Sequence, residues 1–243
     1  MKESNLEKQL RSVFAGPLKR KSFLKYTALS GSALVLGLDA CKKSNNNPGQ
    51  PGTSTVDVGS GDPGILNFAY ALEQLEAAFY IKVNASFYTN ITSAEQAILT
   101  DIMNHEVAHR DFFKAALASA AIPTLSFDFS SVNFSDRTSV LSTAKALEDT
   151  GVSAYNGAGQ YIVSPTYLTL AGKIVSVEAR HASAIRDLLN PLSADFAGDD
   201  VVNATSGLDY SRTPNATDAT HPMSIVATAN TFLTTKISAT KLP

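Results

Sequence analysis

Apolar side chains recur every three or four residues along four segments of the chain, and this spacing places them on one face of an α-helix. The segments cover residues 62–87, 92–120, 136–160 and 164–190. A shorter run, residues 223–237, predicts a last, short helix, and residues 192–221 are expected to form a long loop. The pattern therefore predicts an all-α protein built on four long helices.

Residues that favour helix ends flank these segments. Asp62-Pro63 and Ser164-Pro165 each combine a capping side chain with a proline in the first turn. Thr92-Ser93-Ala94-Glu95 has the pattern of a capping box, and Pro123 ends the helix that follows. Short loops join the helices of each pair, which predicts two helical hairpins.

The connector between the hairpins, residues 121–135, is long and has no helical period. Fully extended it reaches about 50 Å at ~3.3 Å per residue, whereas a helix of about 27 residues measures about 40 Å. It can therefore cross the whole bundle, so that the second and third helices run in the same direction.

Ionisable side chains interrupt the apolar face of every long helix. On the second helix, for example, Glu106 and His109 fall in the same stripe as Ile102 and Phe113. Burying an unpaired charge costs several kcal/mol. A salt bridge, a hydrogen-bond network or a metal ion must therefore compensate these groups.

The two hairpins repeat one pattern. ALEQLEAAFY (71–80) aligns without a gap with ALEDTGVSAY (146–155), and EVAH (106–109) matches EARH (178–181). In each copy a Glu on one helix is matched by Glu-x-x-His on the next, where residues three apart share a helix face. The side chains of this set are Glu73, Glu106, His109, Glu148, Glu178 and His181.

This set has the composition of a site for two metal ions. Four carboxylates neutralise two divalent cations, and each cation receives one imidazole nitrogen. A single Glu-x-x-His on a helix is usually a surface pair or a hydrogen-bonded pair. Two copies at matched places on apolar faces instead favour a carboxylate-bridged dinuclear centre.

Other side chains on the same faces are expected to support this centre rather than to bind metal. Glu76 faces inward, but its counterpart in the repeat is Gly151, so Glu76 is assigned a supporting role. Tyr80 and Tyr155 lie two turns beyond their Glu and are expected to be hydrogen-bonding core tyrosines. His105, at the edge of its stripe, is expected to be structural or exposed.

The segments DPGILNFAYALEQLEAAFY, HEVAHRDFF, ALEDTGVSAY and SVEARHASAI together resemble the ferritin-like domain family, which includes the desiccation-related proteins and many exported bacterial proteins. The resemblance covers residues 62–190 and implies a ferritin-like four-helix bundle of two hairpins with a long crossover, followed by a C-terminal extension over residues 191–243. It also implies two bound iron ions, with manganese or a mixed iron–manganese pair as the alternatives.

The first 41 residues have the features of an export signal. Residues 19–25 are basic, and residues 26–38 are apolar but shorter than the ~20 residues that span a bilayer. LDAC follows, ending at Cys41, the only cysteine of the chain. The segment resembles a bacterial lipoprotein signal, in which the cysteine is lipidated and becomes the mature N-terminus. The alternative is a buried N-terminal helix.

We therefore expect an exported lipoprotein on the periplasmic face of a bacterial membrane, anchored by its lipid. RKSFLK also resembles a twin-arginine signal, but Lys21 stands in place of the second arginine, which leaves the export route open. Residues 42–61 are rich in Gly, Pro, Asn and Ser and are expected to form a flexible linker.

Two functions agree with these features. The first is a di-iron or di-manganese oxidoreductase that reacts with oxygen or peroxide in stress protection. The second is a non-enzymatic, desiccation- or stress-related bundle whose site is structural or empty. The fold does not choose between them. A net charge of -2 gives no reason to expect a nucleic-acid partner.

Overall fold

The computed structural model describes residues 55–198, 202–203, 208–209 and 222–243, which all lie within one compact unit. The expected export signal, Cys41 and most of the expected linker lie outside the described residues. Within the described part of the chain, no helix combines the length and the apolar character needed to span a membrane.

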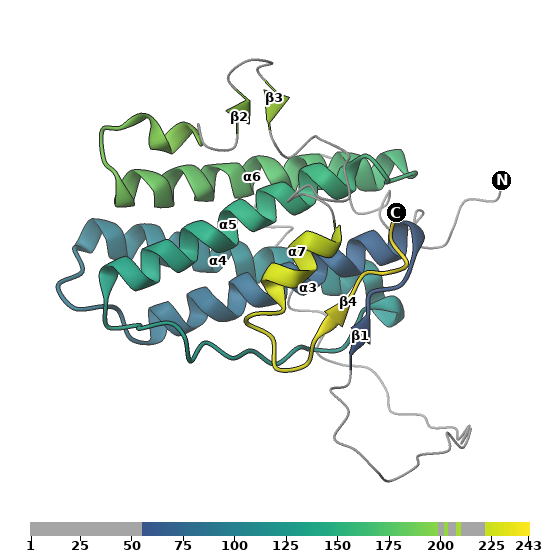
Figure 1. Ribbon diagram of the computed structural model, residues 1–243, viewed down its shortest axis with the longest axis horizontal. Coiled ribbons are helices and arrows are strands. Elements are labelled where there is room, and N and C mark those ends of the chain that lie inside the picture. Colours follow the sequence, from purple (N-terminus) through teal and green to yellow (C-terminus); the bar gives the residue numbers. More distant parts are fainter. Residues whose placement is uncertain (1–54, 199–201, 204–207, 210–221) are drawn as a thin grey trace, which may run out of the picture. The chain divides into compact units, whose positions relative to one another are not determined.

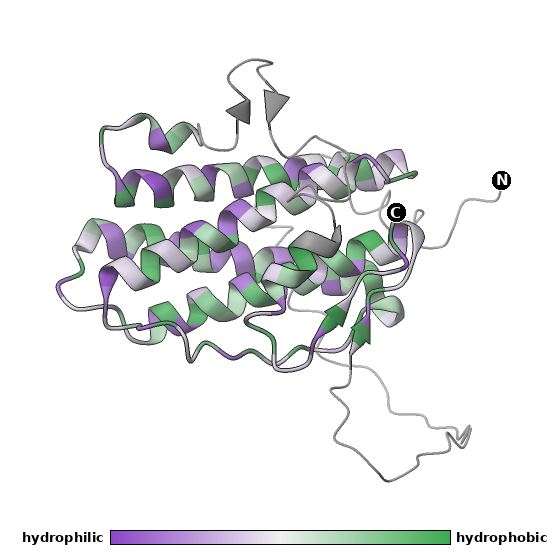
Figure 2. Ribbon diagram, viewed as in Figure 1, coloured by the Kyte–Doolittle hydropathy of each residue, from purple (hydrophilic) through white to green (hydrophobic). Residues whose placement is uncertain are grey.

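Four long helices form a bundle (Figure 1). They are α3 (Gly61–Ala85), α4 (Ser93–Leu117), α5 (Arg137–Gly159) and α6 (Pro165–Leu189). α3 packs against α4 and α5 packs against α6, which confirms the two hairpins, and α3 also contacts α5 while α4 contacts α6. The connector, residues 121–135, runs along the length of the bundle, so α4 and α5 begin at the same end. Figure 2 shows apolar residues along all four helices, interrupted by hydrophilic ones.

The capping box at the start of α4 is confirmed. The Glu95 amide donates to the Thr92 hydroxyl (3.2 Å), and the Thr92 amide donates to the Glu95 carboxylate (3.0 Å). Ser164 caps α6 with Pro165 in the first turn, also as predicted. These caps satisfy amides that a helix start would otherwise leave without acceptors.

The predicted cap of α3 is wrong. The helix begins at Gly61 after Ser60, which caps it without a side-chain hydrogen bond. The Asp62 carboxylate instead accepts the amides of Val163 (2.9 Å) and Ser164 (2.8 Å) in the loop between α5 and α6. A partner distant in sequence therefore takes the side chain that the local pattern assigned to the cap.

α3 is buried on far more than one face. Asn67 Oδ1 accepts the Ile122 amide (2.9 Å), and Gln74 Oε1 accepts the Leu125 amide (2.9 Å), so the connector is bound along α3. Phe79 packs edge-on against Phe129 of the same connector. The connector thus covers the side of α3 that a bundle of four helices alone would leave open.

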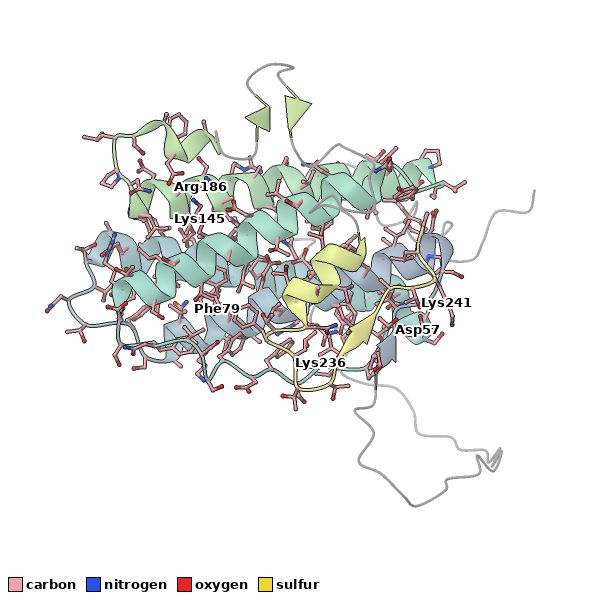
Figure 3. All side chains as sticks on the ribbon, viewed as in Figure 1. Asp57, Phe79, Lys145, Arg186, Lys236 and Lys241 are labelled. Atoms are coloured by element: carbon pink, nitrogen blue, oxygen red, sulfur yellow. The ribbon has the colours of Figure 1, made fainter. Side chains whose placement is uncertain are left out.

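A short helix, α7 (Pro222–Ala229), confirms the expected last helix, but it ends earlier than residue 237. Asn230 turns the chain, since its side chain accepts the Ile237 amide (2.8 Å) and donates to the Ile237 carbonyl (2.9 Å). The chain continues as β4 (Ile237–Ser238), which pairs in parallel with β1 (Val56–Asp57). Lys241 bonds Asp57 at 2.7 Å beside this pair (Figure 3).

The region after α6 also has structure of its own. A 3-10 helix, η2 (Ala194–Ala197), precedes the antiparallel pair β2 (Val202–Asn203) and β3 (Leu208–Asp209). Arg186 of α6 is buried and bonds Asp149 of α5 (2.7 Å) and Asp195 of η2 (3.0 Å). This charge network attaches η2 to the second hairpin.

Candidate metal centre

The six predicted ligand residues come together inside the bundle, and every long helix contributes to the cluster. α3 contributes Glu73, α4 Glu106 and His109, α5 Glu148, and α6 Glu178 and His181. The four carboxylate residues have no exposed surface, and His181 is 5% exposed. The helical period alone places them there, because each occupies the inward stripe of its helix.

The first group surrounds the imidazole of His109. Its Nδ1 lies 2.8 Å from Glu178 Oε1, 3.4 Å from Glu73 Oε2 and 3.6 Å from Glu106 Oε2. These residues offer ligand atoms that all lie within 4.8 Å of one another. Three oxygens and one nitrogen therefore converge on a volume that one cation can fill.

The second group surrounds the imidazole of His181 in the same way. Its Nδ1 lies 2.7 Å from Glu106 Oε1, 3.5 Å from Glu148 Oε2 and 3.7 Å from Glu178 Oε2. Glu106 and Glu178 belong to both groups, and each turns one oxygen to each imidazole. These two carboxylates therefore connect the two groups.

Glu73 and Glu148 each belong to only one group, and a tyrosine from across the α3–α5 interface bonds each of them. Tyr80 of α3 donates to Glu148 Oε1 at 2.5 Å, and Tyr155 of α5 donates to Glu73 Oε1. The expectation that both tyrosines form hydrogen bonds is confirmed, and each bonds the Glu of the opposite helix. One oxygen of Glu73 and one of Glu148 remain directed at the imidazoles.

The facing atoms of the cluster are buried and have no hydrogen bond of good geometry within the described chain. They are Oε2 of Glu73, both carboxylate oxygens of Glu106, Nδ1 of His109, Oε2 of Glu148, both carboxylate oxygens of Glu178, and Nδ1 of His181. Buried polar atoms in native proteins nearly always have a partner. A pair of cations would satisfy all of these atoms at once, so the residues fit such a centre.

A family model described as the ferritin-like domain matches residues 61–191. The match spans the four long helices and all six clustered side chains. The chain belongs to the ferritin-like domain family. No curated protein matches the chain.

Burial and mutual proximity shift the pKa values inside this ferritin-like domain. Burial raises the pKa of Glu148 to about 8, with the nearby Glu106 charge adding to the shift. Burial also raises the pKa of Glu73 well above its usual range, and the Glu178 charge adds to this. For Glu106 the effect of burial is outweighed by its close contacts with the imidazoles of His109 and His181, which lower its pKa to about 2.

The pKa values of the two imidazoles shift in the direction opposite to the effect of burial alone. Burial lowers the pKa of His181, but its close contacts with the carboxylates of Glu106 and Glu148 outweigh this effect and raise the pKa to about 12. The pKa of His109 is raised well above its usual value, because its close contacts with the carboxylates of Glu106 and Glu178 likewise outweigh burial. Without metal, protons therefore take the place of cations in the cluster.

Glu76 breaks the symmetry of the repeat. It is 2% exposed, and its Oε2 has no hydrogen-bond partner in the described chain. Its Oε1 would lie 2.9 Å from a Cβ atom added to Gly151, its counterpart in the repeat. The glycine on α5 thus makes room for the longer side chain of α3, and the supporting role of Glu76 stays a prediction.

The sequence pattern does not predict the contact that His105 makes in this site. It is exposed, as expected, but its Nδ1 lies 2.9 Å from Nε2 of His181 and the two rings stack at 5.2 Å between centroids. Burial and the charges of His181 and His109 lower the pKa of His105. The sequence feature that indicates this contact is the position of His105 directly before Glu106, beside the inward stripe.

The run His105-Glu106-Val107-Ala108-His109 also matches the H-E-x-x-H signature of zinc peptidases, in which both imidazoles bind one zinc ion. In this domain the two imidazoles have different partners. His105 faces His181, whereas Nδ1 of His109 faces the carboxylates. The geometry therefore does not support a zinc peptidase site.

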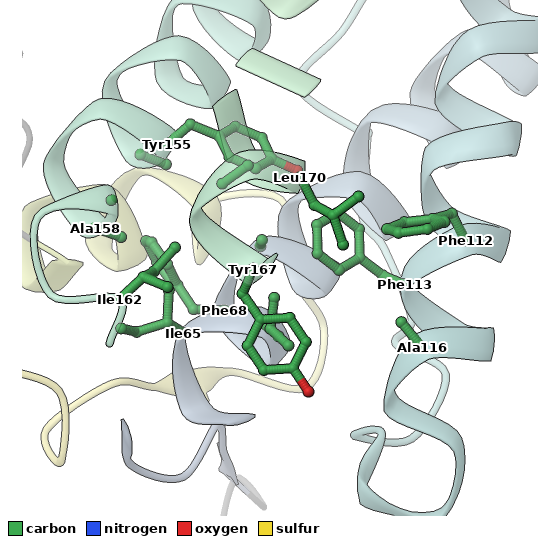
Figure 4. Close-up of a pocket in the computed structure, with 15 residues that line it drawn as sticks. Ile65, Phe68, Phe112, Phe113, Ala116, Tyr155, Ala158, Ile162, Tyr167 and Leu170 are labelled. Carbon is green, nitrogen blue, oxygen red and sulfur yellow. The ribbon is translucent and has the colours of Figure 1, made fainter. Parts of the chain in front are cut away.

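An apolar cavity of about 20 Å³ lies beside the cluster, among α3, α4, α5 and α6 (Figure 4). Tyr155 forms part of its wall, together with Phe113, Phe68 and Leu170. The hydroxyl of the same tyrosine bonds Glu73. One residue therefore separates the cavity from a carboxylate of the cluster.

Proposed function

We propose that this ferritin-like domain binds two metal ions in a carboxylate-bridged centre, and that the loaded centre reacts with oxygen or peroxide in protection against stress. Iron is the proposed metal, with manganese or a mixed pair as the alternatives. The observation that carries the proposal is the set of buried oxygen and nitrogen atoms that face one another without hydrogen bonds.

Two positions follow from the two groups. Glu73 and His109 would hold the ion of position A, and Glu148 and His181 would hold the ion of position B. Glu106 and Glu178 would be shared between them. Because the four Glu side chains of the two positions together carry four negative charges, two divalent ions leave the centre neutral.

Two such ions, when bound, supply electrons and Lewis acidity to a small oxidant. The protein provides the surroundings. Tyr80 and Tyr155 each hold one carboxylate oxygen in place, so that the other oxygen stays directed into the cluster. The cavity beside Tyr155 has room for about one small molecule, and its apolar lining favours an uncharged one.

A non-enzymatic role has support from a different observation. The two imidazoles lie within ion-pair distance of the carboxylates, with closest contacts of 2.8 Å and 2.7 Å. Protonated imidazoles can therefore compensate the charge of the buried carboxylates when no metal is bound. In this alternative the centre would contribute to stability without turnover.

Metal analysis of the purified full-length protein, after growth with iron and manganese, tests the centre. We expect about two ions per chain, because two ligand groups are present. Glu106→Gln keeps the shape but removes a shared charge, and should leave about one ion or fewer. Glu95→Gln on the same helix is the matched control, since Glu95 bonds Thr92 and Arg137 outside the cluster.

Fewer than one ion per chain, unchanged by Glu106→Gln, would contradict the proposal. Consumption of oxygen or peroxide by the loaded protein then separates the two roles. A rate well above that of the free metal supports the oxidoreductase, and a rate equal to that of the free metal supports the structural role.

We also propose that the protein is a lipoprotein attached at Cys41 to the periplasmic face of the membrane. The basic, apolar and LDAC segments of the sequence support this. Cys41→Ser should release the protein from the membrane fraction or leave an unprocessed precursor. Unchanged processing and fractionation of this variant would contradict the lipid anchor.

A further inference from the structure

The two halves of the centre differ in the residue behind the imidazole ligand. Behind His181, Nδ1 of His105 lies 2.9 Å from Nε2. His105 directly precedes Glu106, and the residue directly before Glu178, at the matching place of the repeat, is Val177. An isopropyl group has no hydrogen-bond acceptor, so the repeat offers this partner to only one of its imidazoles.

Metal binding would give this contact a defined direction. A cation held by Nδ1 of His181 takes the lone pair of that atom, so the single proton of the neutral ring must lie on Nε2. Nε2–H is then a donor, and Nδ1 of His105 stands at hydrogen-bond distance as its acceptor. Such a partner fixes both the tautomer and the ring orientation of a ligating histidine.

We propose that His105 is a positioning residue that makes position B bind metal more tightly than position A, so that the two positions fill in order. The assignment rests on the dinuclear centre proposed above. Hydrogen-bond partners of ligating histidines contribute about 10–100-fold to metal affinity in other proteins. The duplicated ligand set would then behave as two unequal sites.

His105 is suited to substitution because its side chain is exposed and the core does not depend on it. His105→Val gives the first half the residue that the second half has at Val177. His105→Gln keeps an acceptor, the amide oxygen, near the same place. Val177→Ala is the matched control, since it changes the equivalent position without changing any acceptor.

Titration of the metal-free, full-length protein with Co²⁺ under anaerobic conditions measures the two affinities. The wild type should bind two ions in steps separated by about 10–100-fold. His105→Val should weaken the tighter step by about the same factor and leave the weaker step unchanged. His105→Gln should retain most of the separation, and Val177→Ala should retain all of it.

Imidazole NMR of the Zn²⁺-loaded protein provides a readout that general packing would not change. The Nε2 proton of His181 should be protected from exchange in the wild type and in His105→Gln, and should exchange rapidly in His105→Val. Circular dichroism of each variant checks that the helices are intact.

Binding of fewer than one Co²⁺ by the wild type would reject the centre itself. Two ions of equal affinity would overturn only the role of His105, as would an unchanged titration of His105→Val. An equal loss in His105→Gln and His105→Val would also overturn it, because that result assigns the effect to ring shape rather than to the hydrogen bond.

Discussion

Gly151→Ala should lower the free energy of unfolding of the metal-free protein. When Glu76 is also shortened to Ala, the same Gly151→Ala substitution should raise it. A Cβ atom at residue 151 would lie 2.9 Å from Oε1 of Glu76, closer than van der Waals contact allows. Both residues are buried, on helices that pack against each other, so neither can move into solvent.

Two opposing contributions set the magnitude. Alanine is favoured over glycine inside a helix by about 1 kcal/mol. Overpacking a buried contact costs about 1–3 kcal/mol. Gly151→Ala alone should therefore change the free energy of unfolding by between about zero and a loss of about 2 kcal/mol. After Glu76→Ala the clash is absent, and the same substitution should stabilise by about 1 kcal/mol.

Urea denaturation of the wild type, Gly151→Ala, Glu76→Ala and the double variant forms a complete cycle. Chelator is present throughout, because bound metal would add its own contribution to the free energy of unfolding. The expected coupling between the two substitutions is about 1–3 kcal/mol in favour of the double variant.

Additive effects, within about 0.5 kcal/mol, would refute this reasoning. They would mean that the Glu76 side chain does not occupy the space that the glycine leaves. A coupling of the opposite sign would also refute it, because the two side chains would then attract rather than exclude each other.

Three further measurements test other parts of the structure. Tyr80→Phe removes the hydroxyl that donates to buried Glu148. It should lower the free energy of unfolding by about 1–3 kcal/mol in urea titrations. An unchanged urea midpoint would contradict this hydrogen bond. Metal binding at pH 7 should release about two protons or more per two ions, since the pKa of His181 is raised to about 12, the pKa of His109 is also raised, and Nδ1 of each must lose its proton. Affinity should therefore rise with pH, and calorimetry in two buffers of different ionisation enthalpy counts the protons; no release would exclude the imidazoles as ligands. Thr92→Ala removes the capping hydroxyl and should cost about 1 kcal/mol in thermal melts, with Ser93→Ala as a control that should have little effect.

The sequence alone determined the four helices, their pairing and the candidate residues of the site. Helix period and capping are local properties, which explains why the inward stripes and the Thr92 capping box agree with the structure. The duplication supplied the rest, because two matched copies of Glu and Glu-x-x-His indicate a shared site where a single copy would not. The family match agrees with this interpretation.

The partner of each side chain was decided only by the tertiary structure. A stripe shows that Tyr80 and Tyr155 face inward, but not that each bonds the Glu of the opposite helix. That result depends on the rotation of α3 against α5. The contact of His105 with His181 likewise joins two helices that lie far apart in sequence.

The errors at segment ends have the same physical origin. Asp62 has the right chemistry to cap α3, yet the amides of Val163 and Ser164 bind its carboxylate instead. Residues after Asn230 could have continued α7, but they pair with β1 at the other end of the described chain. Local preferences amount to about 1 kcal/mol per residue, so contacts with distant segments can outweigh them, and only the folded chain shows which contacts do.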